Sequence, residues 1–267
     1  MNSDSKFSLS KWYLDCITDS GDAMVGYAAS LHWRALALEY SSVLVLRSTD
    51  IIRTKTTLHG GSHPTEAVDC VQWNCPPLAV SGIWQTLERP IARTIFSSST
   101  TPLQWACVQP RSWAEIDCGD LGMFSGYGYV DHIEMTAKPW QLPLEELRWG
   151  RFLSASDSII WMDFKGPFPE SIVFHNGTLC RRVQVSDTEI VLFDEDFRLT
   201  FEETQVLRDG ALVSTVLSEI PGVKNFLPTR MLHTHESKWR SRGILKRGNI
   251  KKSDGWAIHE VVRWPGE

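Results

Sequence analysis

The stretch GYGYVDHIEM, residues 126–135, carries five side chains that can take, give or orient protons: Tyr127, Tyr129, Asp131, His132 and Glu134. The residues between them are glycine, valine, isoleucine and methionine, a composition that favours a β-strand. Carboxyl, imidazole and phenol groups are the usual participants in general acid–base chemistry. The stretch therefore predicts either a proton-transfer site on a strand or a satisfied polar network in a core.

Side chains of a strand alternate between its two faces, so Asp131 shares one face with Tyr127 and Tyr129. If that face lines an apolar pocket, desolvation disfavours the charged carboxylate and raises the pKa of Asp131. A carboxylic acid that keeps its proton at neutral pH can protonate an alkene, epoxide or carbonyl. The two tyrosines would orient the substrate or stabilise developing positive charge through their ring faces.

Two other interpretations of the stretch remain open at this stage. Asp131 could be ionised and paired with an arginine, Arg148 or Arg151, in which case the pair would serve specificity more than catalysis. Alternatively, His132 and Glu134, which share the opposite face, could form the working pair.

Histidines near the C-terminus suggest a different chemistry. His233 and His235 stand at strand spacing in MLHTHESKW, Glu236 follows directly, and His259 lies further on. A pair of imidazoles on one strand face with a later histidine is a common metal geometry in β-barrels. A polar strand end or a pocket lining by His235 and Glu236 is the favoured interpretation, so we expect no metal and no cofactor.

Bulk composition excludes several protein classes. The 267 residues are 42% hydrophobic and 22% charged, as in a globular protein, and the net charge of −5 gives no reason to expect a nucleic-acid partner. No apolar run approaches the ~18 residues of a membrane span, and the N-terminus lacks a signal-peptide layout, so a cytoplasmic location is expected. The six cysteines form no CxxC pair and are expected to be free buried thiols; the oligomeric state stays open.

Twelve tryptophans are many for a chain of this length. Rigid aromatic faces fill large cores and also shape apolar ligand pockets. We expect tryptophans such as Trp33, Trp73 and Trp149 to wall a substrate pocket.

Strand signals dominate the chain and predict an all-β fold. Residues 41–54 are rich in β-branched side chains, and residues 170–185 form two β-prone runs around Asn176-Gly177, a strong hairpin signal. Further turns are expected at Asp209-Gly210 and Asp254-Gly255, and the basic segment 237–252 is expected to be a solvated hairpin with a Gly-Asn turn. Short helices are expected only at residues 30–40 and 142–149.

The two halves of the sequence share a pattern. Residues 11–27 and 148–164 each have a basic residue, a tryptophan, a Ser/Asp turn and an apolar strand, and both halves close on a strand with His and Glu before Trp and Pro. This pattern predicts an internal repeat, with units at 1–138 and 139–267.

The run Tyr129-Val-Asp131-His132-Ile-Glu134 resembles a strand of the carotenoid 1,2-hydratase and AttH-like lipocalin family. The resemblance implies two consecutive lipocalin-like β-barrel or sandwich units with a pocket in or between them. It also places the Tyr-x-Asp pair of the hydratases on Tyr129 and Asp131. The His-x-Trp pair of the hydratases has only the adjacent His32-Trp33 as a counterpart, which weighs against hydration while leaving the acid role of Asp131 open.

Together these patterns favour a cofactor-independent acid–base enzyme, a cyclase, isomerase or hydratase. Its substrate would be a largely apolar small molecule such as a terpenoid or another natural-product intermediate. The alternative is a lipocalin-like binding protein that holds an apolar ligand in the same pocket without turnover.

Overall fold

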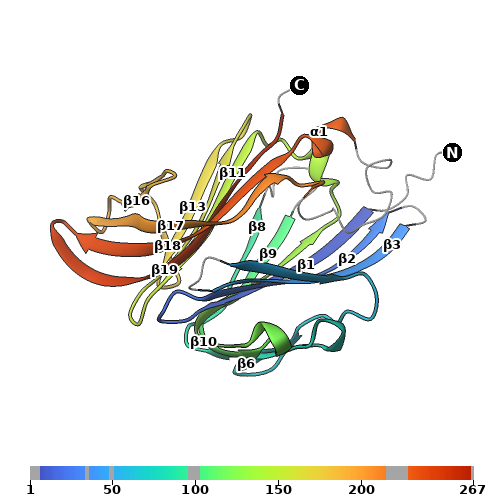
Figure 1. The fold of residues 1–267 in the computed structure, drawn as a ribbon. Helices are drawn as coiled ribbons and strands as arrows, with labels where there is room; N and C mark the ends of the chain where they lie inside the picture. Colours follow the sequence, from blue (N-terminus) through green and yellow to red (C-terminus); the bar gives the residue numbers. More distant parts are fainter. Residues whose placement is uncertain (1–6, 34–35, 48–50, 96–102, 215–227, 266–267) are drawn as a thin grey trace. The chain divides into compact units, whose positions relative to one another are not determined.

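The computed structural model describes residues 7–33, 36–47, 51–95, 103–214 and 228–265. The chain divides into two compact units, residues 1–141 and 142–267, each built round one antiparallel sheet (Figure 1). The predicted all-β class with two consecutive lipocalin-like units is confirmed. Among the described residues, no helix has the length and apolarity needed to cross a membrane.

The sheet of the first unit has ten strands in the order β4-β3-β2-β1-β10-β9-β7-β6-β5, with β8 paired to β9. The strands are β1 (Phe7–Ile17), β2 (Ala23–Trp33), β3 (Leu36–Leu46), β4 (Ile52–Thr57), β5 (Thr65–Glu66), β6 (Cys70–Cys75), β7 (Val80–Thr86), β8 (Ile91–Ile95), β9 (Leu103–Asp117) and β10 (Met123–Met135). Three 3₁₀ turns complete it: η1 (Pro76–Leu78), η2 (Gly119–Leu121) and η3 (Pro139–Gln141).

The sheet of the second unit has nine strands in the order β14-β13-β12-β11-β19-β18-β17-β16-β15. The strands are β11 (Glu146–Leu153), β12 (Ser158–Lys165), β13 (Glu170–His175), β14 (Thr178–Cys180), β15 (Val183–Val185), β16 (Glu189–Leu192), β17 (Phe197–Ala211), β18 (His235–Arg247) and β19 (Ile250–Arg263), with a short helix α1 (Thr229–Leu232) before β18. β13 and β15, from opposite ends of this order, contact one another, so the sheet curls towards closure.

The two sheets have equivalent topologies. In each unit the first strand pairs with both the second and the last strand, and the segments 11–27 and 148–164 form the corresponding first hairpins. The registers align residue by residue, because Ile17 faces Ala23 and Tyr127 while Leu153 faces Ser158 and Trp256. Counting four residues along the last strands makes Asp131 and Glu260 equivalent positions.

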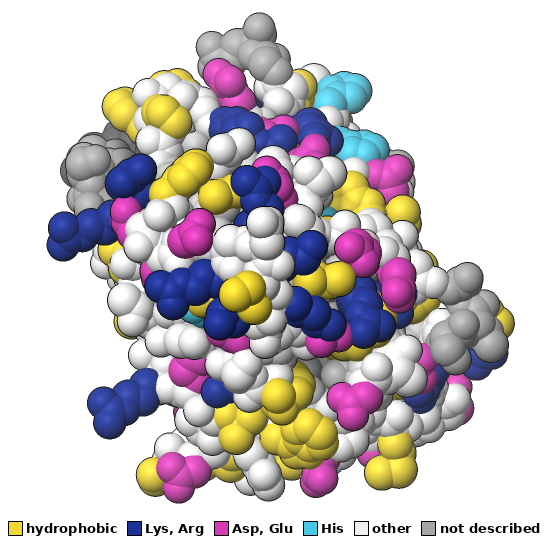
Figure 2. Space-filling view, turned by 90° about the vertical axis from the view of Figure 1, so that its left-hand side faces the viewer, with side chains coloured by type: hydrophobic (Ala, Val, Ile, Leu, Met, Phe, Trp, Pro, Cys, Tyr) yellow, Lys and Arg dark blue, Asp and Glu magenta, His cyan; other side chains and the backbone are white. Residues whose placement is uncertain are grey.

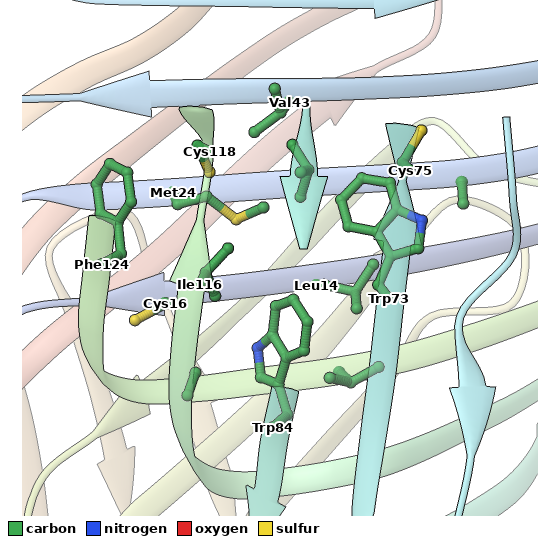
Figure 3. Packing of buried hydrophobic residues seen from close by; sticks show 14 of the residues in the cluster. Leu14, Cys16, Met24, Val43, Trp73, Cys75, Trp84, Ile116, Cys118 and Phe124 are labelled. Atoms are coloured by element: carbon green, nitrogen blue, oxygen red, sulfur yellow. The ribbon is translucent and has the colours of Figure 1, made fainter. Parts of the chain in front are cut away.

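The core of the first unit lies on the face of β1 that carries Leu14 and Cys16 (Figure 3). Trp73 and Trp84 are fully buried in it. A Cβ atom on Gly26 would come within 2.7 Å of the Trp73 ring, so glycine at this position leaves the room that the indole fills. The second unit has its own apolar core around Phe152 and Trp161.

Several local predictions fail because long-range strand pairing overrides local sequence preference. The described part of residues 30–40 is not helical: Ser30–Trp33 belongs to β2 and Leu36–Tyr40 to β3, paired in register, and residues 34 and 35 lie outside the described residues. Residues 142–149 are not helical either, since β11 begins at Glu146. Asp209-Gly210 and Asp254-Gly255 lie within β17 and β19 and make no turns.

Other local predictions are confirmed. Asn176-Gly177 joins β13 to β14, and both residues have positive φ, as a two-residue hairpin of the primed type requires. The hairpin between β18 and β19 turns at Gly248-Asn249. All six cysteines are free, and five of them are buried.

The basic segment 237–252 is only partly solvated, which corrects the prediction. Lys238 and Arg240 are buried, and Arg242 pairs with Asp254 at 2.6 Å. Figure 2 shows Lys and Arg side chains together with Asp and Glu side chains on one face.

Candidate proton-transfer site on strands β1, β9 and β10

Asp131 lies in the middle of β10 with 3% of its surface exposed. The Tyr129 hydroxyl donates a hydrogen bond to its Oδ2 atom at 2.8 Å, and the indole N–H of Trp105 on β9 donates to the same atom at 3.2 Å. Tyr129 and Asp131 share a strand face because they are two residues apart. The carboxyl is therefore held by two neutral donors in a buried setting.

A second pair of the same kind stands on the neighbouring strand. On β1, the Tyr13 hydroxyl donates to Asp15 Oδ2 at 2.9 Å, and both side chains are buried. The antiparallel register sets Tyr13 opposite Asp131 and Asp15 opposite Tyr129. Two Tyr-x-Asp pairs running in opposite directions thus form a four-cornered cluster, with the two tyrosine rings 6.0 Å apart.

The cluster raises the pKa of its weak acids. Burial, followed by the negative charge of Asp131, raises the pKa of Tyr129 well above its ordinary value. Burial and then the charges of Asp131, Glu88 and Asp15 likewise raise the pKa of the Cys107 thiol, despite an opposing hydrogen bond with Tyr129. Tyr129 and Cys107 therefore stay protonated at neutral pH.

The remaining residues of the stretch fall on both faces of β10. Tyr127 shares the face of Asp131 and packs edge-on against Trp113. His132 lies on the other face, stacked on Trp12 at 4.2 Å and hydrogen-bonded to Ser10, and burial lowers its pKa. Glu134 is exposed. The alternative His132–Glu134 pair is thus separated from the Tyr-x-Asp cluster by the sheet itself.

The tryptophans expected to wall a pocket are dispersed. Trp73 belongs to the packed core of the first unit and donates its indole N–H to the Ser62 carbonyl at 2.8 Å. Trp33 lies at the end of β2 against Trp140. Trp149 is in the second unit, with the Lys238 ammonium 5.6 Å from its ring centre.

The polar residues proposed near the C-terminus are also in the second unit and do not join one site. His235 pairs with Asp209 at 3.0 Å and is half-exposed, whereas Glu236 is buried beside Arg208 and Lys238. His259 faces Trp239, four residues along β18 from His235. His233 caps α1, so the three histidines of the metal hypothesis are not brought together.

His259 is instead part of an aromatic network inside the second unit. Its Nε2 atom shares a hydrogen bond of 2.9 Å with the Ser241 hydroxyl, which also contacts the Thr204 hydroxyl. The ring stacks on Phe201 at 4.6 Å. Burial lowers the pKa of His259 to about 4, so the imidazole is neutral at physiological pH.

Arg148, one proposed partner of Asp131, forms its ion pairs with Glu146, Asp163 and Asp187, at 3.0, 3.8 and 2.8 Å. The alternative that it neutralises Asp131 joins residues of the two units and stays a hypothesis. Arg151 is fully buried and donates to the Trp256 carbonyl at 2.7 Å.

Sequence reasoning missed Tyr13 and Asp15. The signal was present, because YLD at 13–15 has the same Tyr-x-Asp spacing as YVD at 129–131. Trp105 and Cys107 left no comparable signal. They reach the site only through the pairing of β9 with β10, which sets Cys107 opposite Asp131.

Comparisons with known proteins identify solved structures with a similar fold. No family model matches the chain, and no curated protein matches its sequence. Among solved structures, CghA with Sch210972 superposes with a TM-score of 0.58 at 10% identity, covering 96% of this chain and 88% of CghA. An AttH-like protein (NE1406) from Nitrosomonas europaea gives 0.53 at 9%, covering 98% and 93%.

Kievitone hydratase from Nectria haematococca gives a TM-score of 0.51 at 12% identity, covering 98% of this chain and 90% of the hydratase. These identities establish a likeness of fold. The resemblance inferred from the β10 stretch is confirmed at that level: the chain has the two-unit lipocalin-like fold of the AttH-like and hydratase structures.

Proposed function

We propose that the protein is an acid–base enzyme that acts on a largely apolar small molecule without a cofactor. Asp131 is its proton-transfer group. The observation that carries the proposal is the buried carboxyl of Asp131, held on Oδ2 by the neutral donors Tyr129 and Trp105. Burial disfavours the charged carboxylate, while the fixed donors keep it oriented.

In the proposed reaction, Asp131 protonates a carbon–carbon double bond or a carbonyl of the substrate and becomes a carboxylate. Positive charge develops on the substrate and is stabilised by the ring faces of Tyr129 and Tyr13. Loss of a proton from a neighbouring carbon gives an isomer, attack by a second double bond gives a ring, and attack by water gives a hydrate. All three outcomes begin with the same proton transfer.

The comparisons support small-molecule chemistry on this fold without fixing the reaction. Kievitone hydratase is named for a hydration, and CghA was crystallised with Sch210972. His32, the only counterpart of the hydratase His-x-Trp pair, is exposed on β2. We therefore favour isomerisation or cyclisation over hydration for this chain.

The test incubates the purified protein with a panel of polyenes, enones and terpenoid alcohols in D₂O and follows the products by mass spectrometry. A product that contains deuterium but otherwise has the elemental composition of the substrate indicates isomerisation or cyclisation. A product heavier than the substrate by one D₂O indicates hydration. Asp131→Asn should lower kcat by about 10²- to 10⁴-fold while ligand affinity stays within about 3-fold.

A variant that turns over substrate as fast as the wild type would remove Asp131 from the mechanism. Binding of panel compounds with no turnover by the wild type would instead favour the alternative function, a lipocalin-like carrier. Fluorescence quenching of the tryptophans, recorded with the same compounds, separates that result from absence of binding.

A further inference from the structure

The proposed acid has a second carboxyl beside it. Asp15 is fully buried, accepts a hydrogen bond from Tyr13, and lies diagonally across the β1–β10 pair from Asp131. Diagonal neighbours on an antiparallel pair have Cα atoms about 7–8 Å apart, within reach of one small substrate.

We propose that Asp15, oriented by Tyr13, is the proton acceptor of the site, so that Asp131 and Asp15 form an acid–base pair. The inference rests on the proposed function of Asp131 and adds the group that completes the reaction. Its substrate class is an apolar molecule in which one carbon gains a proton and a nearby carbon loses one, as in a double-bond shift or a cyclisation ended by proton loss.

The step balances without a co-reactant. Asp131 breaks its O–H bond and a C–H bond forms on the substrate double bond, which leaves a cation. A neighbouring C–H bond then breaks, its electrons form the new double bond, and the proton goes to the Asp15 carboxylate. Before the next cycle Asp15 loses its proton to water and Asp131 regains one from water, while the Tyr13 and Tyr129 hydroxyls hold the two carboxyls in place.

The surroundings make the two carboxyls interdependent. We expect like charges on one face of this buried strand pair to oppose double ionisation, so that protonation of one carboxyl favours the charged form of the other. Titratable and charged groups around the cluster include Lys11 and Tyr13 on β1, Tyr27 on β2, Arg93 on β8, Cys107 and Arg111 on β9, Tyr129 on β10, and Glu88 after β7. The charges of both aspartates reach Cys107, which places the two carboxyls around one thiol.

The first test needs no substrate. Infrared difference spectra of the carboxyl C=O stretch follow protonated buried carboxyls as a function of pH in the wild type, Asp131→Asn and Asp15→Asn. We expect the Asp131 band to titrate at a pH about one unit lower in Asp15→Asn, because the repelling charge is gone. A midpoint that stays within about 0.3 unit overturns the inference. Asp163→Asn, a buried carboxyl of the second unit, is the matched control and should leave the band unchanged.

The second test uses a substrate that the wild-type enzyme converts. The wild-type rate should be bell-shaped in pH, because the acid must be protonated and the base ionised. Asp15→Asn should lower kcat by about 10²-fold or more and abolish the acidic limb, with KM within about 3-fold. If both limbs persist in Asp15→Asn, Asp15 is not the proton acceptor.

Tyr13→Phe is a second variant that tests the pair where Asp15→Asn does not fold. Removal of one donor to the Asp15 carboxylate should move the acidic limb to higher pH, and an unmoved limb counts against the pair. The two proposals can fail separately. A shifted infrared midpoint without turnover of any compound contradicts the enzyme but keeps the coupled pair, whereas turnover that depends on Asp131 but not on Asp15 contradicts only the pair.

Discussion

Asp131 and Glu260 occupy equivalent positions on the last strands of the two units, yet their surroundings are opposite. On β9, the residue facing Asp131 is Cys107, and the neighbouring donors are Tyr129 and Trp105. On β18, the residue facing Glu260 is Lys238, which forms an ion pair with it.

The difference also holds on the first strands. Tyr13 and Asp15 of the first unit correspond to Trp149 and Arg151 of the second. Within one topology, the Asp131 carboxyl accepts hydrogen bonds from Tyr129 and Trp105, whereas the Glu260 carboxylate forms an ion pair with the buried Lys238. A lysine partner favours the charged form of a carboxyl. The two units share the strand position, and the side chains around it determine whether its carboxyl has a catalytic or a structural role.

The largest effect on stability should follow the loss of the buried cation. Lys238→Met leaves Glu260 and Glu236 without its charge, and we expect a cost of about 3–5 kcal/mol in the free energy of unfolding, measured by urea denaturation. Cys107→Ala, the equivalent change in the first unit, should cost only about 1–2 kcal/mol. Similar costs for the two variants would contradict the assigned difference, and Lys238→Met combined with Glu260→Gln should recover part of the loss.

The next effect concerns His259, whose equivalent in the first unit is Val130. Because burial lowers the pKa of His259 to about 4, the unfolded chain binds a proton more readily than the folded one. Stability should therefore fall as pH drops from about 6.5 towards 4, by about 2 kcal/mol between pH 7 and 5. Urea unfolding of the wild type and of His259→Val measures this slope, and the same slope in both proteins would contradict the assignment.

A smaller effect on stability, with the opposite dependence on pH, should come from His175. Burial alone lowers its pKa, but hydrogen bonds to Asp157 and Glu195 outweigh burial, so the pKa is raised. Its contribution to stability is present below about pH 6.5 and is lost as pH rises through the raised pKa. Amide hydrogen exchange of β13, corrected for intrinsic rates, should show weaker protection at pH 8 than at pH 6.

The first unit supplies the control for that effect. Asp22, the equivalent of Asp157, pairs at 2.9 Å with Arg47, which keeps its charge over this range. Protection of β2 and β3 should therefore stay constant from pH 6 to 8. An equal loss in both units would show that the pH effect does not arise at His175.

The sequence predicted what depends on alternation within a strand. Tyr129 and Asp131 share a face because they are two residues apart, and the structure adds the hydrogen bond between them. The sequence could not reveal Asp15 or Trp105 as neighbours of Asp131, because those contacts depend on which strands pair and in which register. The β1–β10 pairing joins residues more than a hundred positions apart, and short local signals do not encode it.

Aromatic residues show a second limit of sequence reasoning. Trp73 and Trp149 are equally apolar in the sequence, but Trp73 fills the space above Gly26 in a core and Trp149 lies under the Lys238 ammonium. Helices predicted at 30–40 and 142–149 fail for a related reason, since described residues of both segments pair with neighbouring strands. In each case the residues contacted in the folded structure determined the environment or the secondary structure of the segment.

The most direct measurement of the central claim is the paired comparison of Asp131→Asn and Glu260→Gln in one turnover assay with the same substrate in D₂O. The proposed acid role of the buried Asp131 predicts that its variant loses about 10²-fold or more in kcat, while Glu260→Gln stays within about 3-fold of the wild type once both are assayed well below their melting temperatures. Equal losses in the two variants, or a larger loss in Glu260→Gln, would contradict the claim that the first unit carries the proton chemistry.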